Sequence, residues 1–182
     1  NLKMKNYIKP LAVGIIGLLS IATVASAHGD EFKPAFVDSL VPNYLATQTA
    51  LAGDDLGGAK KAAGELVATA KNGPSFPAFT APASAIAQAE NIKSARANFL
   101  TVSMEMQDLV DHVGTTGEHS LYEAHCPMAF GGKGGSWLQG DQNVLNPYFG
   151  SLMLHCGSIK GIIAGASKTN ASPGGDHSGQ NH

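Results

Sequence analysis

Four sulfur-bearing residues near the carboxyl end of the chain form two pairs with short spacings. Cys126 and Met128 are two positions apart, and Met153 and Cys156 are three apart. Residues two apart in an extended segment project to the same side, and residues three apart in a helix share a face. Each spacing therefore predicts two sulfurs directed at one point. Two thiolates and two thioethers form a soft ligand set, which favours Cu(I) or Ag(I) over Mg²⁺ or Ca²⁺.

Each cysteine also has a histidine beside it in the chain. His125 precedes Cys126, and His155 precedes Cys156. Imidazole ligands would extend the range of bound ions to Zn²⁺ or Cu²⁺. Because neighbouring side chains in an extended segment point in opposite directions, the two histidines rank below the four sulfurs as metal ligands.

The alternative for the two cysteines is a disulfide, since exported cysteines usually oxidise. A bridge from Cys126 to Cys156 would close a loop of about 31 residues and stabilise the fold by roughly 3.5 to 4 kcal/mol. The protein would then be a stapled structural or protein-interaction domain without a metal. Oxidised cysteines cannot bind metal as thiolates. Both interpretations therefore hold only if the pair alternates between the disulfide and the reduced thiols. Thiol redox chemistry is a third hypothesis, and it predicts a strongly lowered cysteine pKa.

The elements that must position these residues are predicted to be helices over most of the chain. Three stretches show apolar residues at three- and four-residue steps: 36–51, 56–70 and 83–113. Pro34 suits the first turn of the first helix, and Asp55 suits the N-cap of the second. The third stretch fits one long helix or two helices broken near Asn91. Three prolines mark a linker before it: Pro74, Pro77 and Pro82.

The region that follows is rich in glycine and carries both cysteines and the only tryptophan. Residues 151–163 are expected to form a last short helix, and Trp137 and Tyr148 to pack this region onto the helices. We therefore predict an all-α, up-down bundle of about four helices, with an irregular Gly-rich insertion before the last one. The metal-binding domain would span residues 34–165, followed by a disordered polar tail at 166–182.

The amino-terminal segment has the pattern of a secretory signal. Lysines precede the apolar stretch 11–24, which is shorter than the about 20 residues of a membrane span, and Ala25-Ser26-Ala27 fits a cleavage site. We expect cleavage after Ala27, a periplasmic protein without stable membrane insertion, and a flexible mature start at 28–33. Cleavage would join the free amine and the imidazole of His28 into a two-nitrogen chelate suited to Cu²⁺.

Composition and motifs exclude other function classes. The 182 residues carry 12 Lys and Arg against 14 Asp and Glu, a net charge of −2, without a basic stripe. Nucleic acid is therefore not an expected partner. The chain has no nucleophile motif of the G-x-S-x-G type, and Cys126 precedes a proline instead of opening a recognisable helix. We expect a protein that is not an enzyme.

Several short motifs resemble a known bacterial family. In order, they are HCPMAF (125–130), GGKGGSWLQ (131–139), NPYFG (146–150) and MLHCG (153–157). This series resembles a domain-of-unknown-function family, number three-three-four-seven, found alone or fused to CusB-type periplasmic heavy-metal efflux adaptors. Further upstream, FVDSLVPNY (36–44), LAGDD (51–55) and RANF (96–99) look like its helical part, so the resemblance covers nearly all of residues 34–163.

The resemblance implies a helical bundle with a role in copper or related heavy-metal resistance. Four residues match the sulfur positions of its motif: Cys126, Met128, Met153 and Cys156. It also implies an efflux adaptor or a metallochaperone as partner. Together with the residues themselves, it predicts a periplasmic protein that buffers Cu(I) or Ag(I) or passes it on, with thiolates supplying affinity and thioethers permitting release.

Overall fold

The structure is a computed structural model that describes residues 31–164. It begins with four long helices: α1 (Pro34–Ala52), α2 (Leu56–Ala70), α3 (Pro77–Ala87) and α4 (Ile92–His112). Strands and short helical turns follow: β1 (Leu121–Cys126), α5 (Ala129–Gly132), β2 (Gly135–Gln139), the 3₁₀ turn η1 (Gly150–Leu152) and β3 (Ser158–Ala164). None of the helices within residues 31–164 has the length and apolar character that a membrane span requires.

Some expectations from the sequence fall outside the described residues. These are the signal peptide at 1–27, the mature terminus at His28 and the polar tail at 166–182. The segment expected to be flexible at 28–33 is described from Glu31 onward. Within it, Phe32 is buried and packs its ring against Phe76.

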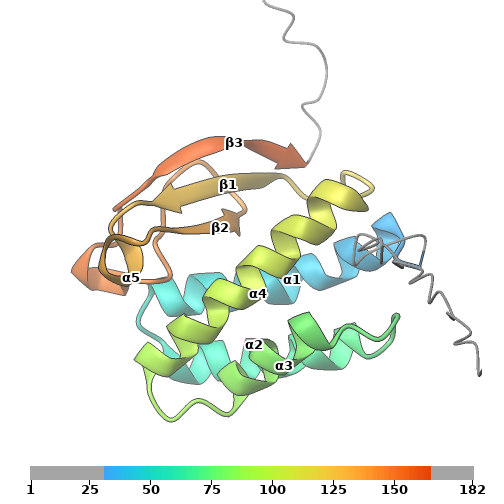
Figure 1. The fold of residues 1–182 in the computed structure, drawn as a ribbon, viewed down its shortest axis with the longest axis horizontal. Coiled ribbons are helices and arrows are strands. Elements are labelled where there is room, and N and C mark those ends of the chain that lie inside the picture. Colours follow the sequence, from blue (N-terminus) through green and yellow to red (C-terminus); the bar gives the residue numbers. More distant parts are fainter. Residues whose placement is uncertain (1–30, 165–182) are drawn as a thin grey trace, which may run out of the picture.

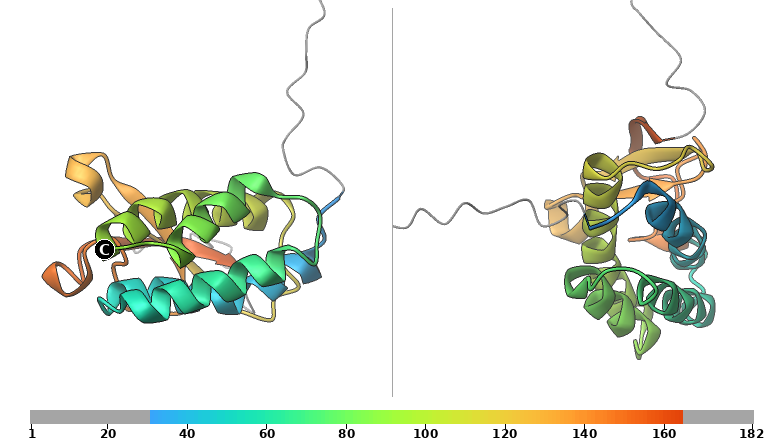
Figure 2. Two further views of the ribbon diagram at one scale, coloured as in Figure 1. Left: turned by 90° about the horizontal axis from the view of Figure 1, so that it is seen from below. Right: turned by 90° about the vertical axis from the view of Figure 1, so that its right-hand side faces the viewer.

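The helices and the sheet form layers (Figure 1). The three strands pair antiparallel in the order β2-β1-β3. The sheet lies over α4 and α1, while α2 and α3 lie on the side of these helices that faces away from it (Figures 1 and 2). One contiguous apolar core joins the layers, and the buried rings of Tyr44 and Phe99 stack within it. The hydroxyl of Tyr44 accepts a hydrogen bond from the backbone N–H of Leu138, which ties the edge strand β2 to α1.

The helix boundaries follow local signals. Asp55 caps α2 by accepting a hydrogen bond from the backbone N–H of Gly58 at 2.8 Å. Asn91 caps α4 in the same way, so the break near Asn91 is confirmed and the third apolar stretch is two helices. The linker prediction is wrong in its second half, because Pro77 opens α3 and Pro82 lies inside it. Proline fits the first helical turn, where its missing N–H has no helical partner.

The all-α prediction is wrong, because a three-stranded antiparallel sheet follows the helices. The last helix expected at 151–163 is also absent, replaced by η1 and then β3. Gly150 and Gly157 have φ angles of 63° and 132°, which do not continue a helix. The β-branched residues beyond Gly157 instead pair with β1. The packing expected of the two aromatic residues is confirmed, since both Trp137 and Tyr148 are buried in the core.

Candidate metal centre

The fold brings the two cysteines together. The sulfur atoms of Cys126 and Cys156 lie 2.7 Å apart. Cys126 is the last residue of β1 and is fully buried, whereas Cys156 is half-buried in the turn that leads into β3. One sulfur is therefore fixed in the sheet and the other sits in an irregular segment.

Strand pairing and one glycine produce this approach. β1 pairs with β3 so that His125 faces Ser158, which brings the turn before β3 to the end of β1. Gly157 passes so close that a Cβ there would lie 2.8 Å from the carbonyl oxygen of His125 and 3.2 Å from the Trp137 ring. Its φ of 132° also favours glycine. A side chain at this position would force the backbone or its neighbours to shift.

Asn146 holds the turn by hydrogen bonds. Its side-chain nitrogen donates to the carbonyl oxygen of Cys156 at 2.8 Å, and its backbone N–H donates to Leu154 at 2.7 Å. Its side-chain oxygen accepts from the backbone N–H groups of Tyr148 and Phe149. Asn146 is fully buried, so these bonds are shielded from water. Asn146 precedes Pro147, and Asn before Pro is a turn signal in the sequence.

The two methionines do not adopt the predicted local geometry. The strand ends at Cys126, and Met128 has α-region backbone angles and a side chain that is 55% exposed. Met153 follows η1 in a non-helical conformation and accepts a hydrogen bond from the N–H of Cys156, forming a turn. The predicted extended pair and helical pair are therefore both wrong. The thiols come together through pairing of distant strands, not through these local spacings.

The two histidines differ in what their rings contact. Nδ1 of His125 lies 3.0 Å from the hydroxyl oxygen of Ser136, its cross-strand neighbour. Nδ1 of the exposed His155 lies 2.8 Å from the carbonyl oxygen of Val144, so it must carry the proton and donate. Metal-binding histidines are commonly oriented by such a bond, which leaves Nε2 with its lone pair. His155 is therefore protonated on Nδ1, and its Nε2 can bind a metal ion. The hydroxyl group of Ser136 can either donate or accept, so it does not decide which nitrogen of His125 carries the proton.

The charge state of the thiols depends on their proximity. The Cys126 thiol, chiefly through the hydrogen bond between the sulfurs, raises the pKa of Cys156, and desolvation adds to this effect. The thiol redox hypothesis predicts a strongly lowered pKa in at least one of the two cysteines, and the pKa of Cys156 is shifted in the opposite direction. Within residues 31–164, no group of three or more His, Cys, Asp or Glu side chains could hold a metal ion. An ion bound here would depend on two thiolates with a thioether, imidazole or solvent ligand.

An ion pair ties the turn region to the helices. Asp54 contacts Arg96 at 2.6 Å and accepts a hydrogen bond from the backbone N–H of Ser151 at 2.9 Å. Arg96 also donates to the carbonyl oxygens of Leu51 and Pro147. Hydrogen bonds from Ser151, followed by those from Arg96, lower the pKa of Asp54 to about 2. This contact anchors η1, the turn that precedes the Cys156 segment.

Comparison with known proteins supports the family resemblance for the helical layer. Residues 40–118 match the family model described as a protein of unknown function (DUF3347). This range covers most of α1, all of α2 to α4, and ends before β1 and both cysteines. No curated protein and no solved structure matches the chain.

Proposed function

We propose that this protein, whose residues 40–118 match the DUF3347 family, binds a soft metal ion, Cu(I) or Ag(I), between Cys126 and Cys156. The single observation that carries this proposal is the 2.7 Å separation of the two sulfur atoms. The prediction of export places this binding in the periplasm. The protein then buffers the ion or passes it to an efflux adaptor or metallochaperone.

The small number of ligands supports Cu(I) or Ag(I) over Zn²⁺. Structural Zn²⁺ sites use four ligands, nearly always in a tetrahedral arrangement. Within the described part of the chain, no third His, Cys, Asp or Glu side chain joins the thiols in a metal-binding group. Soft monovalent ions accept two or three sulfur ligands, so a thiolate pair is sufficient for them. Cu²⁺ and Zn²⁺ would need additional ligands, such as His155 Nε2 and water.

The turn that carries Cys156 allows the pair to open. Metal–sulfur bonds of about 2.3 Å require two sulfurs around one ion to be about 3.7 Å apart or more. The sulfurs must therefore separate by about 1 Å from their present 2.7 Å. Cys126 is fixed by strand pairing, whereas Cys156 lies between η1 and β3 and is free of ladder hydrogen bonds. We expect Cys156 to make this movement.

Met153 and Met128 supply exchangeable ligands in this proposal. Met153 is linked to Cys156 by a backbone hydrogen bond of 3.0 Å, so its thioether starts within the same turn. Met128 is more than half exposed and lies two residues beyond Cys126. An exposed thioether suits transfer, because a partner can reach it before the buried thiol releases the ion.

The test is an anaerobic Cu(I) titration of the reduced mature protein against a competing chelator. Wild type should bind one equivalent, Cys156→Ser should lose at least a hundredfold in affinity, and Met128→Leu/Met153→Leu should lose less. Met104→Leu is the control, because Met104 is exposed on α4 and apart from the cysteines in the sequence. Equal affinity in wild type and Cys156→Ser would contradict the proposal.

The same distance also favours a second candidate, a domain stapled by a Cys126–Cys156 disulfide. Both cysteines lie at the junction of the paired strands β1 and β3, where a bridge would hold the turn in place. Counting free thiols on protein isolated from the periplasm separates the candidates. Two oxidised cysteines, with no Cu(I) binding after reduction, would support the staple and exclude the metal site.

A further inference from the structure

The spacing of the two sulfurs is closer to that of a disulfide than to that of two ligands on one ion. Their separation of 2.7 Å exceeds a disulfide bond of about 2.05 Å by roughly 0.65 Å, whereas an ion between them requires an opening of about 1 Å. Two thiols at such a distance can release two electrons by forming the bond between them. The pair is therefore arranged as an electron donor as well as a ligand set.

The two thiols differ in their access to solvent. Cys126 is fully buried at the end of β1, and Cys156 is half-buried in the turn before β3. An ion that arrives from solvent therefore meets Cys156 first. Cys126 is shielded from solvent and only 2.7 Å away, so it is placed to close the S–S bond.

His155 supplies a ligand for a cupric ion beside the accessible thiol. It precedes Cys156 in a turn closed by the hydrogen bond from the Cys156 N–H to the carbonyl oxygen of Met153. Its ring is exposed, and the bond from Nδ1 to the carbonyl oxygen of Val144 leaves Nε2 with a lone pair. Imidazole suits Cu²⁺ as a ligand. The residue next to the accessible thiol is thus one that binds copper in its oxidised state.

We propose that the protein reduces Cu²⁺ to Cu(I), with Cys126 and Cys156 as the electron donors and His155 as the ligand that captures the cupric ion. The inference deepens the proposed function and rests on it in requiring copper to reach the same thiol pair. Copper supplied as Cu(I) is bound by this pair, and copper supplied as Cu²⁺ is reduced by it.

The reaction balances with Cu²⁺ as the oxidant. Each of two Cu²⁺ ions accepts one electron, the two sulfurs join in one S–S bond, and the two thiol protons pass to water. Oxidised cysteines no longer bind metal as thiolates, so the Cu(I) formed passes to soft thioether ligands. Met153 lies in the same turn as Cys156, and Met128 is more than half exposed.

Anaerobic addition of Cu²⁺ to the reduced mature protein tests the reaction, with a Cu(I)-specific chelator added to samples taken over time. Wild type should yield two Cu(I) ions per chain and lose both thiols, and mass spectrometry should find Cys126 joined to Cys156. The rate per molecule should not depend on protein concentration, because the bond forms within one chain. Thiols that survive Cu²⁺, or disulfides only between chains, would overturn the proposal.

The two single cysteine variants should differ from each other. Cys126→Ser keeps the accessible thiol, so it should reduce Cu²⁺ only by joining two chains, at a rate per molecule that rises with protein concentration. Cys156→Ser keeps only the buried thiol and should lose the reaction. Reduction at the wild-type rate in both variants would overturn the proposal, because the pair would then not be the donor.

His155→Gln tests the capture of Cu²⁺ without changing the thiols. The initial rate should fall about tenfold or more, as for residues that orient bound metals, while the Cu(I) affinity stays at the wild-type value. His112→Gln is the matched control, because that exposed ring also has Nδ1 at 3.0 Å from a backbone carbonyl oxygen, that of Asp108. α4 ends at His112 on the side of the fold where β1 begins, away from Cys126 (Figure 1). An unchanged rate in His155→Gln would overturn the proposal, since reduction would then need nothing beyond two thiols.

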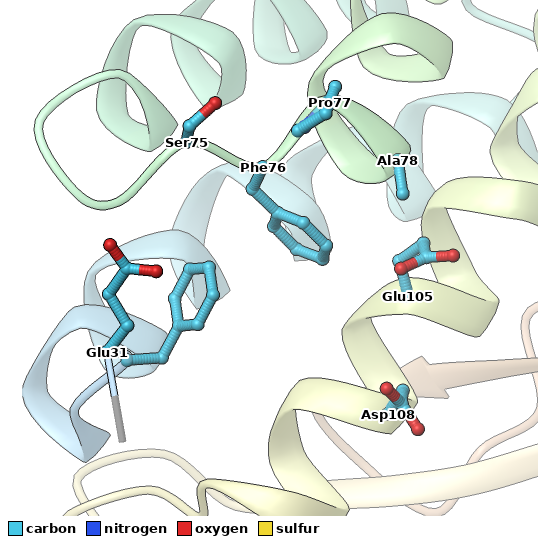
Figure 3. Close-up of a pocket in the computed structure, with 8 residues that line it drawn as sticks. Glu31, Ser75, Phe76, Pro77, Ala78, Glu105 and Asp108 are labelled. Carbon is cyan, nitrogen blue, oxygen red and sulfur yellow. The ribbon is translucent and has the colours of Figure 1, made fainter. Parts of the chain in front are cut away.

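Cu²⁺ that collects elsewhere on the protein does not affect this measurement. A pocket of about 350 Å³ between the starts of α1 and α3 and the second half of α4 is lined by carboxylates, among them Glu31 and Glu105 (Figure 3). Its described lining residues include no Cys, Met or His. Copper held there stays oxidised, so a chelator specific for Cu(I) does not detect it.

Failure of this inference and failure of the proposed function give different results. Tight Cu(I) binding by the reduced protein, without reduction of Cu²⁺, would overturn only the inference. Reduction of Cu²⁺ that depends on His155, without tight Cu(I) binding, would support the inference and contradict the proposed binding of Cu(I) between the thiols.

Discussion

The side-chain nitrogen of Asn146 donates a hydrogen bond of 2.8 Å to the carbonyl oxygen of Cys156. This bond joins a fully buried amide to a cysteine that lies outside any helix or strand. Cys156 lacks ladder hydrogen bonds, so its backbone is held by the bond from Asn146 and by the bond from its own N–H to the carbonyl oxygen of Met153. The distance between the two sulfurs therefore depends on a residue that does not contact them.

Replacing Asn146 tests this positioning role. Asn146→Ala would leave the Cys156 carbonyl and the N–H groups of Tyr148 and Phe149 without partners. We expect a loss of about 2 to 3 kcal/mol in the free energy of unfolding, measured by urea denaturation. Cu(I) affinity should fall about tenfold or more, as for other residues that orient ligands. The exposed Asn143→Ala is the control, and an unchanged Cu(I) affinity in folded Asn146→Ala would contradict the role.

Gly157 gives a second prediction about the same turn. A Cβ at this position would lie 2.8 Å from the His125 carbonyl oxygen, and the φ of 132° is strained for other residues. Gly157→Ala should therefore cost about 2 to 4 kcal/mol of stability and separate the sulfurs. Gly161→Ala is the matched control in β3, because a Cβ there meets nothing within 4 Å. Equal stability of both variants would show that the approach at Gly157 is not required.

The helical part of this fold could be predicted from local sequence, and the sheet could not. Regular apolar spacing and the caps Asp55 and Asn91 are local signals, and the helices follow them. β1 is short and its pairing with β3 is interrupted by register shifts, so its alternation is weak. The segment 151–163 has apolar residues that fit either a helix or a strand over so short a length. Its pairing with β1 decides between them.

In the candidate site too, some features could be predicted from local sequence and others depend on tertiary contacts. The sequence identified Cys126 and Cys156 as a pair, and the structure brings their sulfurs together. The reasoning behind this prediction was wrong, because it used the residue spacing within each segment, whereas the sulfurs are brought together by pairing between distant strands. Asn146 and Gly157 act through tertiary contacts, which short-range patterns do not contain. A glycine with positive φ and a buried amide are recognised only when the neighbouring strand is in place.

The raised pKa of Cys156 predicts how metal binding depends on pH. A thiol that keeps its proton at neutral pH must release it when a metal binds. The apparent Cu(I) affinity should therefore rise with pH, by up to tenfold per unit for each proton released, and level off above the thiol pKa. Cys156→Ser should remove this part of the slope. Chelator competition between pH 6 and pH 9 measures it, and a flat profile would contradict proton displacement at Cys156.

The Asp54 contact predicts a loss of stability in acid. Its pKa of about 2 in the folded protein is below the ordinary 3.8, so its carboxylate form stabilises the fold. This contribution is complete above the ordinary pKa and disappears as the pH falls from about 4 through 2. Because the Asp54 side chain is 40% exposed, solvent screening makes the effect smaller than the shift alone implies.

Asp54→Asn is the matched variant for this contact. Asparagine tolerates the left-handed backbone at this position, where φ is 58°, and keeps an oxygen for the Ser151 N–H. It removes the charge and also the oxygen that accepts from Arg96, because its amide nitrogen then faces the guanidinium. Urea denaturation of both proteins should show wild type more stable at pH 6, with the difference vanishing toward pH 2. A difference that stays constant across this range would mean that the Asp54 charge does not anchor η1.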